Sequence, residues 1–548
     1  MEQQQQHKRQ RTQPQPPSQQ QHHHHQQQQQ PEAAPYDAHA DPSRIWLPEV
    51  VHHFASFLSG NELACTLRLV NKATATQFRE LQHTTVRLSL PVPHHAFTWR
   101  WGGSDATRSL TVRQRMQLPC LTARSGSIAN LEVLLARDDL TSPLDVYVME
   151  AAAGAGQLEV CRWLRQQECT WNSGTVFGFA ARGGHKEVCE WLLAQGCPRF
   201  ADVLQFTAGG GHWAVCEGLL ATGCWEDVGA AAAAACGGHV GLMDWLLART
   251  NARSPDVRDL LDAAAVGCDL PTLQRLHHTY LDSRIVAAAA GSPTADWRDK
   301  VAWLEGQGCP RTSLACVQAA ARRADGRGRL EWLQQRGYAL IADVAHSAAR
   351  HGNADALEFL LAQGVEMGEV GLATFEASRG GHLAVLKVLR AHGARIDLHS
   401  VACSAVACGH LPVLAWGVQE LGAALSADMY KSAASSGSAE LVAWLHEHGC
   451  PWDTSVFAEV ARSGSEEQLE RLVEHGCPMG DDGGPYYWAL WNADLAMLRC
   501  LGRLGCPWGP VGLRAVKACE TRFGTAPGRC QQLLRALTWL VEQGCPVD

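Results

Sequence analysis

The chain has 548 residues, a formal net charge of −8 and an isoelectric point near 6.3. A chain of this length exceeds one ordinary hydrophobic core, so several domains or a repeat array are expected. The acidic balance provides no general attraction for nucleic acid or an anionic membrane, and we expect neither as a partner. No apolar run approaches the roughly 20 residues that a membrane span needs, which predicts a cytoplasmic protein.

Residues 1–43 form a tail that is rich in Gln, His and Pro. The tail has almost nothing to bury, so we expect it to be disordered. We interpret the basic residues Lys8, Arg9 and Arg11 as part of a solvated tail. The alternative is a nuclear import signal, which would imply a nuclear location. The histidines at residues 22–25 are assigned no native metal site.

Residues 45–80 read IWLPEVVHHFASFLSGNELACTLRLVNKATATQFRE, which predicts two or three short helices. Pro48 suits the first position of a helix, and the apolar residues that follow it make one face. Gly60 interrupts this pattern, and Leu63 and Leu67 begin a second apolar stripe. One interpretation of these helices is a cap over the open end of a repeat array.

A second interpretation rests on a resemblance. The stretches LPEVVHHFASFL and LRLVNK resemble the F-box, a helical module that docks on the Skp-type adaptor of a cullin ubiquitin ligase. Asn71 stands where the family more often has Cys or Ser, and the family's following Trp is missing. The resemblance implies a module over residues 44–82 whose adaptor-binding region contains Leu47, Pro48, Glu49, Val51, Phe54 and Leu58, supported by Leu63, Leu67 and Val70.

Residues 83–118 are interpreted as a connector between this module and the repeats. Within it, TTVRLSLPV at residues 84–92 alternates polar and apolar side chains like a short strand. The stretch TWRWGG follows before the repeats begin.

From residue 119 to the end, one phrase recurs in variants such as AARGGHKEVCEWLLAQGCPRF. The glycine before Cys-Pro, or its equivalent in other copies, returns 27 residues later between Gly196 and Gly223, and 29 residues later between Gly308 and Gly337. Degenerate copies near Thr250 and Thr279 bring the count to roughly fifteen units, well above the three that a stable array needs. The sequence therefore predicts one long repeat array.

Each unit is predicted to form two helices. In the quoted copy the first helix covers residues 175–181, and the second carries Val188, Trp191 and Leu192 on one face. Gly196 stands where a C-terminal cap needs a positive φ, and Pro198 prevents the helix from resuming. Alanine doublets before the turn let neighbouring units come close, so stacked copies would bury a continuous core.

The phrase A-A-x-x-G-H-x-x-V-x-x-W-L-x-x-x-G-C-P resembles the ankyrin repeat over about four fifths of the chain. The resemblance implies an all-α, ankyrin-like solenoid of helical hairpins. The period is shorter than the usual 33 residues, and the T-P-L-H phrase is absent. We therefore expect the hairpin finger of the standard repeat to be shortened or missing.

The 21 cysteines are predicted to be reduced packing residues. Pairs such as Cys189 and Cys197 are eight residues apart, about 12 Å along a helix, which exceeds the reach of a disulfide. No C-x-x-C occurs, so a zinc site has no support.

Three further groups of residues recur with the repeat and are assigned structural roles. The tryptophans of the second helix and after the cap are expected in the core: Trp163, Trp191, Trp245, Trp303, Trp332, Trp416, Trp444, Trp539, Trp171, Trp225, Trp452 and Trp508. The turn histidines are expected to stabilise turns: His185, His212, His239, His382 and His410. The basic stretch with Arg322, Arg323, Arg327 and Arg329 is interpreted as a solvated loop, with an acidic partner as the alternative.

The function predicted from these features is that of a protein-interaction scaffold. The F-box resemblance implies a substrate receptor that holds a target protein on the repeats and a ligase adaptor on residues 45–80. The alternative is a repeat binding protein without a ligase role, whose N-terminal helices serve as a cap. Phosphate-binding, zincin and nucleophile-elbow motifs are missing, so we expect no enzyme, no cofactor and no metal.

Overall fold

A computed structural model describes residues 47–140, 144–169, 171, 174–224, 228–250, 257–277, 281–322, 324–509 and 527–545. The expected tail at residues 1–43, the import signal, Trp225, Thr279 and Arg323 lie outside these residues. The chain divides into two compact units, residues 1–57 and residues 58–548. The described part of the first unit is the single helix α1, Pro48–Ala55, with its flanking residues.

The second unit begins with short helices and continues as a stack of helical hairpins. The short helices are α2 (Gly60–Cys65), η2 (Leu67–Leu69), α3 (Lys72–Gln77), α4 (Leu81–Thr84) and α5 (His94–Trp101). The described residues contain helices and no strand, so the predicted all-α class is confirmed. The segment at residues 84–92, interpreted as part of a connector although it alternates like a short strand, is irregular after α4, because the described chain offers no second strand for it to pair with.

Each hairpin consists of a first helix, a tight turn and a second helix. The first helices are α6 (Val112–Arg124), α8 (Val146–Gly154), α10 (Thr175–Arg182), α12 (Val203–Gly209), α14 (Val228–Cys236), α16 (Val257–Gly267), α18 (Ser283–Gly291), α20 (Ser313–Ala320), α22 (Ala342–Arg350), α24 (Gly371–Arg379), α26 (Leu398–Ala407), α28 (Ala427–Ser436), α30 (Thr454–Ser463) and α32 (Gly484–Trp491).

The second helices follow at regular spacing, and one further helix comes after the last hairpin. They are α7 (Ile128–Leu135), α9 (Leu158–Gln166), α11 (Lys186–Ala194), α13 (Trp213–Ala221), α15 (Val240–Leu247), α17 (Leu270–Leu276), α19 (Trp297–Gly306), α21 (Gly326–Gln335), α23 (Ala354–Ala362), α25 (Leu383–Ala391), α27 (Leu411–Gln419), α29 (Ala439–Glu447), α31 (Glu466–Glu474), α33 (Leu495–Arg503) and finally α35 (Pro527–Glu542).

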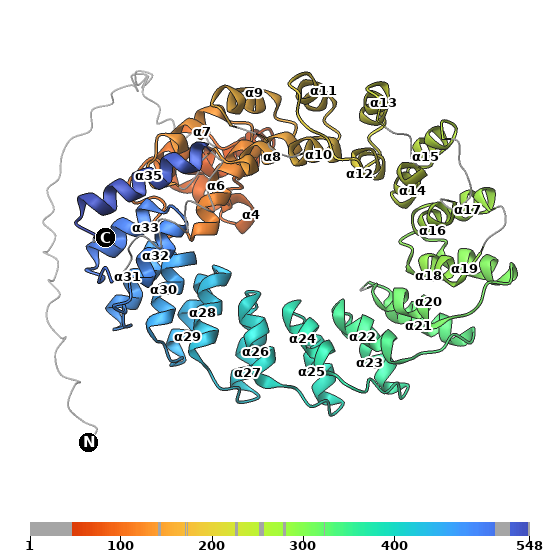
Figure 1. The fold of residues 1–548 in the computed structure, drawn as a ribbon. Helices are drawn as coiled ribbons and strands as arrows, with labels where there is room; N and C mark the ends of the chain where they lie inside the picture. The colour runs from red at the N-terminus through yellow and green to blue at the C-terminus, as the bar shows by residue number, and fades with distance from the viewer. Residues whose placement is uncertain are drawn as a thin grey trace, which may run out of the picture. The chain divides into compact units, whose positions relative to one another are not determined.

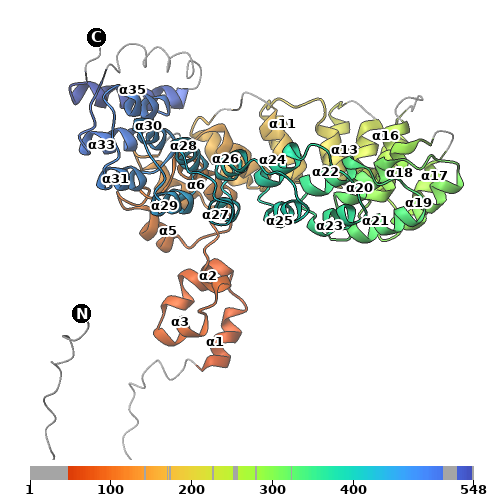
Figure 2. The same ribbon diagram turned by 90° about the horizontal axis from the view of Figure 1, so that it is seen from below.

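The first helices line the inner side of the curved stack and the second helices its outer side (Figure 1). Figure 2 shows the second helices from α21 to α31 as one row beside the row of first helices. The alanine doublets explain the close spacing: Ala180 and Ala181 are fully buried, and so are Ala348 and Ala349. Side chains this small let first helices approach each other, and one hydrophobic core runs through the stack.

The predicted helix caps are confirmed. In the quoted repeat, Gly196 has φ +72° and donates its N–H to the Leu193 carbonyl, which ends α11. The corresponding glycines also have positive φ: Gly223, Gly308, Gly337, Gly364, Gly393, Gly422, Gly449, Gly476 and Gly505. Residues 195–202 then lead to the next hairpin without a strand, as expected from a shortened finger.

The two ends of the stack contact each other. The Val112 N–H at the start of α6 donates to the Gly464 carbonyl in the turn after α30, at 3.3 Å. The Glu467 N–H donates to the Arg108 carbonyl at 3.2 Å. Helix α30 accordingly lies beside α6 (Figure 1). The stack of hairpins in the second unit therefore closes on itself, which the repeat pattern did not predict.

Candidate functional site

The nine residues of the F-box-like pattern divide into an exposed and a buried group. In the first unit, Leu47 is the N-cap of α1 and Pro48 its first residue, while Leu47 and Phe54 are each 58% exposed. The exposed members are Leu47, Pro48, Glu49, Phe54, Leu58 and Val70, and the buried members are Val51, Leu63 and Leu67.

Two exposed apolar side chains of the second unit were not singled out from the sequence. Leu69 in η2 is mostly exposed, and Leu81 at the start of α4 is 80% exposed. Single exposed apolar residues are common. These two are notable because several exposed apolar side chains occur together in the short helices that precede the hairpins. A signal in the sequence existed for Leu69, which belongs to the quoted stretch LRLVNK.

The buried side of α2 is fixed to the first hairpin. Ala64 and Cys65 of α2 share a small hydrophobic core with Phe97 and Trp101 of α5, and with residues of α6 and α7. The Asn61 side chain donates to the carbonyls of Arg87, Leu90 and Pro91 and accepts from the Arg87 N–H at 2.8 Å. Helices α2 and α5 thus cover the hydrophobic end of the stack as a cap does.

A groove of about 700 Å³ lies among the first helices α20, α22 and α24. Its acidic lining residues are Asp343, Glu369 and Glu376, and the Leu372 side chain adds an exposed apolar surface. The basic lining residues are Arg350, His346 and His351. The groove can therefore hold a segment of another molecule that offers both apolar and charged groups.

Only some of the charges in this groove are paired. The Arg350 guanidinium lies 3.9 Å from a Glu376 carboxylate oxygen, and both side chains are partly exposed. The His346 Nε2 lies 3.4 Å from the Glu369 carbonyl oxygen. Ion pairs this exposed contribute little to stability, so their charges remain available to a ligand.

A smaller hollow of about 290 Å³ lies further along the same inner face, among α26, α28 and α30. Asp428 and Lys431 form an ion pair there, and the Glu459 carboxylate accepts hydrogen bonds from Ser435 and from Arg462. Its polar groups bond mainly to each other. The larger groove is thus the better candidate for a binding surface.

The turn histidines join neighbouring hairpins, which confirms their predicted structural role. The His212 Nε2 lies 2.9 Å from the Arg182 carbonyl oxygen of the preceding hairpin, and His410 Nε2 lies 2.7 Å from the Arg379 carbonyl oxygen. Asn353 takes the same place, and its Nδ2 donates to the Arg322 carbonyl at 2.8 Å. These bonds satisfy carbonyls at helix ends that would otherwise lack donors.

One arginine of the basic stretch is not solvated, so the loop interpretation is wrong for it. Arg329 is buried, and its Nη1 donates to the carbonyls of Ala290 and Ser292 at 2.7 and 2.8 Å. Its Nε bonds to Asp325 at 2.8 Å. Arg329 thus bonds to carbonyls of the preceding hairpin, as the turn histidines do. The sequence pattern did not show this shared role, because an insertion before α21 gives Arg329 a different position in its repeat.

The repeat tryptophans pack against the core as expected. Trp416 is buried, and the others within the described side chains are partly buried against the same hydrophobic core. Two tryptophans outside the repeat pattern are exposed, Trp99 in α5 and Trp213 in α13. The periodic tryptophans therefore do not form a separate binding surface.

All nineteen cysteines within the described side chains are free thiols. Burial raises the pKa of the Cys161, Cys189 and Cys316 thiols to about 12, which keeps them protonated and unreactive. Cys236 and Cys408 are exposed. The cysteine pairs predicted to remain reduced are confirmed as unbridged.

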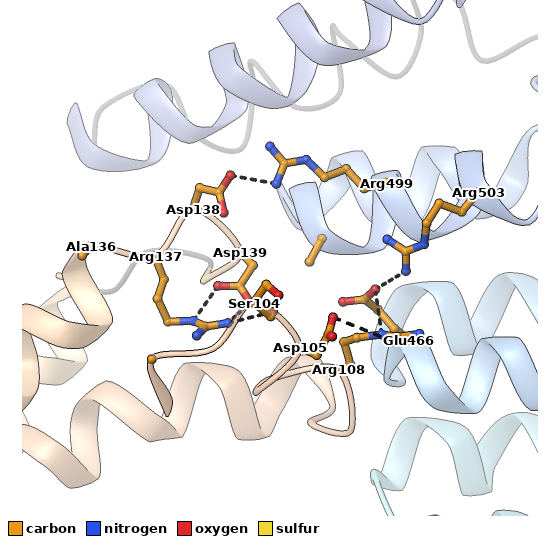
Figure 3. Close-up of a pocket in the computed structure, with 12 residues that line it drawn as sticks. Ser104, Asp105, Arg108, Ala136, Arg137, Asp138, Asp139, Glu466, Arg499 and Arg503 are labelled. Carbon is orange, nitrogen blue, oxygen red and sulfur yellow. Dashed lines mark hydrogen bonds and ion pairs between the residues drawn. The ribbon is translucent and has the colours of Figure 1, made fainter. Parts of the chain in front are cut away.

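The contact between the two ends of the stack is rich in charge, and we call it the closure seam. From the N-terminal side it contains residues 105–140, and from the C-terminal side residues 464–503 with Gln532. A cavity of about 380 Å³ opens within it. Figure 3 shows Asp138 paired with Arg499, and Arg503 paired with Glu466, around this cavity.

A second layer of seam contacts is more buried. The Arg108 Nη2 lies 2.6 Å from a Glu470 oxygen, and this carboxylate raises the Arg108 pKa although burial opposes the shift. Arg115 forms an ion pair with Asp494, and their side chains are 1% and 0% exposed. On the N-terminal side, hydrogen bonds from Arg137 and Thr107 outweigh burial and lower the pKa of Asp139.

The part of the chain that the structure describes lacks both a metal-binding cluster and a membrane-spanning helix. It contains no group of three or more His, Cys, Asp or Glu side chains arranged to hold a metal ion. No helix within these residues is both long and apolar enough to cross a membrane.

Comparison with known proteins identifies the repeats. The family model of ankyrin repeats (many copies) matches residues 149–193, which contain α9, α10 and most of α8 and α11, and the repeats are ankyrin-like. No curated protein matches the sequence. An all-helical stack of ankyrin-like hairpins is the architecture of a repeat-type binding scaffold.

Solved structures of helical-repeat proteins are similar over much of the chain. The pentatricopeptide repeat protein PPR10, in complex with an 18-nucleotide psaJ RNA element, is 13% identical with a TM-score of 0.27, and the match covers 83% of this chain and 78% of that one. PPR10 from maize is 14% identical with a TM-score of 0.24, covering 86% and 82%. Likenesses of this size say nothing about what the chain binds.

Proposed function

We propose that the protein is a substrate receptor of a cullin-type ubiquitin ligase. In this proposal the helices of residues 45–80 dock a Skp-type adaptor, and the inner face of the repeats holds a target protein. The observation that carries it is the exposure of Leu47, Phe54 and Leu58, which the F-box resemblance places in the adaptor-binding region. Exposed apolar anchors of this kind are typical of interface centres. A cytoplasmic or nuclear location follows from this role.

The groove among α20, α22 and α24 is our candidate for the target surface. Its three carboxylates, Asp343, Glu369 and Glu376, outnumber the one arginine that lines it. Charge complementarity favours a target segment that carries Lys or Arg next to an apolar side chain. This choice of target agrees with the negative net charge of the chain.

A second candidate function is a repeat binding protein without a ligase role. The hydrophobic core that Ala64 and Cys65 share with α5, α6 and α7 favours it, because a cap needs this contact and an adaptor does not. The two functions differ in whether the exposed apolar side chains have a partner.

Adaptor capture by the full chain separates the two functions. We expect the purified protein to bind a purified Skp-type adaptor, and Leu47→Ala/Pro48→Ala to abolish this binding, since truncated interface anchors typically cost about 2 kcal/mol or more each. Trp99→Ala is the matched control, because Trp99 is exposed in α5 outside the pattern. Absence of binding by the unmodified protein would reject the ligase role, and a double variant that melts early would mark these residues as a cap.

A further inference from the structure

The closure seam is held by a different chemistry from the rest of the stack. Consecutive first helices are joined by buried alanines and one continuous hydrophobic core. Across the seam, the structure places ion pairs of Arg108 with Glu470 and Glu466, of Arg115 with Asp494, and of Asp138 with Arg499. Two backbone hydrogen bonds and one from the Gln532 side chain to the Leu140 carbonyl complete it.

These contacts make the seam the weakest interface of the stack. Arg499 and Asp138 are about half exposed, so solvent and salt screen their attraction. Hydrophobic contacts between neighbouring hairpins are not screened by salt, and burial of each large apolar side chain adds to them. If the stack opens at one interface, we therefore expect it to open at the seam before any interface between neighbouring hairpins.

The buried Arg115–Asp494 pair makes the closed state specific, but its burial also carries a desolvation cost. Of the Arg115 guanidinium, only Nη2 bonds to Asp494, and Nε and Nη1 contact no acceptor among the described residues. A charged group with unbonded N–H groups loses hydration when it is buried. Opening the seam returns Arg115 and Asp494 to water, which offsets part of the contacts that are lost.

We propose that the closure seam is a reversible ionic latch. When the latch is closed, the Arg108, Arg115 and Asp138 pairs join the two ends of the stack. When ions screen the exposed Asp138–Arg499 pair and weaken the partly exposed Arg108–Glu470 pair, or when a charge among these pairs is changed, the ends separate and the inner face of the first helices becomes accessible from the side. The latch would thereby add a lateral route by which a partner reaches the inner face.

Two backbone amides report on the latch directly. The N–H groups of Val112 and Glu467 bond across the seam, so their hydrogen exchange is protected only while the seam is closed. We expect exchange in peptides that contain these amides to accelerate about tenfold between low salt and 1 M salt in the full chain. The His212 N–H, which bonds to the Thr207 carbonyl within a repeat, should keep its rate.

Charge exchange at Arg108 and Glu470 tests the latch without a change of solvent. Arg108→Glu places a carboxylate beside Glu466 and Glu470, and Glu470→Arg places a guanidinium beside Arg108 and Arg503. Each single variant should accelerate exchange of both seam amides and increase the maximum dimension in small-angle scattering. The double variant Arg108→Glu/Glu470→Arg restores an attractive pair and should recover most of the protection.

Arg275→Glu is the matched control, because Arg275 pairs with Asp244 at 2.9 Å between two neighbouring hairpins away from the seam. It should leave both seam amides and the scattering profile unchanged. The latch is rejected if the single charge variants exchange like the unmodified protein, or if the seam amides are unprotected at low salt. If the single variants lose helix content, they are misfolded, and the salt experiment on the unmodified chain then decides whether the latch exists. No adaptor or target is needed, so the result is independent of the ligase proposal.

Discussion

Arg115 and Asp494 lie 379 positions apart in the sequence and form an ion pair whose side chains are 1% and 0% exposed. Asp494 is at the turn of its hairpin, the position that histidine occupies in the middle repeats. There the histidine Nε2 faces a carbonyl oxygen of the preceding hairpin, whereas the Asp494 carboxylate accepts from an arginine of the first hairpin. Asp494 at this position therefore adds a contact between the two ends, while the Asn492 side chain bonds to the Arg462 carbonyl of the preceding hairpin at 2.6 Å.

The first prediction concerns this carboxylate. Asp494→Asn keeps the cap of α33, since Asp494 accepts the Met497 N–H at 3.1 Å and an amide oxygen can do the same. It leaves the Arg115 charge without a counterion, which in a buried site costs roughly 3–5 kcal/mol. Opening of the seam relieves this cost, so we expect a larger maximum dimension in small-angle scattering at unchanged helix content.

The control for this variant is Asp269→Asn. Asp269 also stands at a hairpin turn and caps α17 through the Thr272 N–H at 3.1 Å, but it forms no salt bridge with another described residue at the far end of the stack. Adding Arg115→Met to Asp494→Asn removes the buried charge and should close the seam again. If the double variant is as extended as the single one, the ion pair does not govern closure.

The repeats could be predicted from the sequence because each contact repeats with the chain. The φ of Gly196 and the burial of Ala180 and Val188 follow from local pattern and period alone. The seam could not be predicted, because its partners are far apart in sequence and none of them repeats. The sequence signals the seam only where it departs from the repeat pattern, as with Asp494 and Ser465 in place of the turn histidine.

The segment at residues 84–92 shows how a local pattern can suggest a structure that does not form. Its alternation is real, but a strand requires a partner for its backbone groups, and the Asn61 side chain satisfies several of them instead. Asn61 bonds to Arg87 and Pro91, which lie 26 and 30 residues further along. The hydrogen bonds of one distant side chain thus take the place of the strand pairing that the alternation suggests.

The second prediction compares two glycines of one repeat. Gly223 has φ +78° at the end of α13, and Gly218 lies within α13, and neither would bring a Cβ within 4 Å of another group. Gly223→Ala should destabilise the protein by roughly 1–2 kcal/mol, because only its backbone conformation is unfavourable for alanine. Gly218→Ala should stabilise it by up to about 1 kcal/mol through helix propensity.

Urea unfolding followed by circular dichroism measures both glycine variants. The two substitutions add the same methyl group, so opposite shifts of the midpoint can only come from the backbone. Equal shifts in one direction would contradict the cap assignment.

The third prediction concerns thiol reactivity. Burial raises the pKa of Cys161 and Cys316 to about 12, and the thiolate is the reactive form, so these thiols should not react at pH 8 in the native protein. Cys236 and Cys408 are exposed and should react quickly with a chromogenic disulfide reagent. In denaturant without reductant, all 21 thiols of the chain should react.

A mild reductant should leave the melting temperature unchanged, because no described cysteine is bridged. A thiol count well below 21 in denaturant, or a melting temperature that falls by many degrees with reductant, would reveal disulfides.

The last prediction concerns pH and Glu305 at the end of α19. Its side chain is almost fully buried, and both oxygens accept from the Arg336 Nε of the next hairpin, at 3.2 and 3.1 Å. Burial alone would raise the Glu305 pKa, but the hydrogen bonds and charge of Arg336 outweigh it, and the pKa lies below the ordinary value of 4.5. A carboxyl whose pKa is lower in the folded state stabilises that state above pH 4.5, and this stabilisation is lost as the pH falls through the folded pKa.

Glu305→Gln should therefore lower the urea midpoint at pH 7, by roughly 1–3 kcal/mol in the free energy of unfolding, since Arg336 loses a charged acceptor. The difference between variant and unmodified protein should shrink as the pH is lowered from about 4.5 toward 3, because the unmodified carboxyl then also becomes neutral. Glu331→Gln is the control, since Glu331 pairs with Arg327 at 2.9 Å on an exposed helix surface and should change the midpoint little at any pH. A difference between Glu305→Gln and the unmodified protein that persists undiminished at pH 3 would show that the amide acts through packing. In that case the ion pair between α19 and α21 would not be what joins these two hairpins.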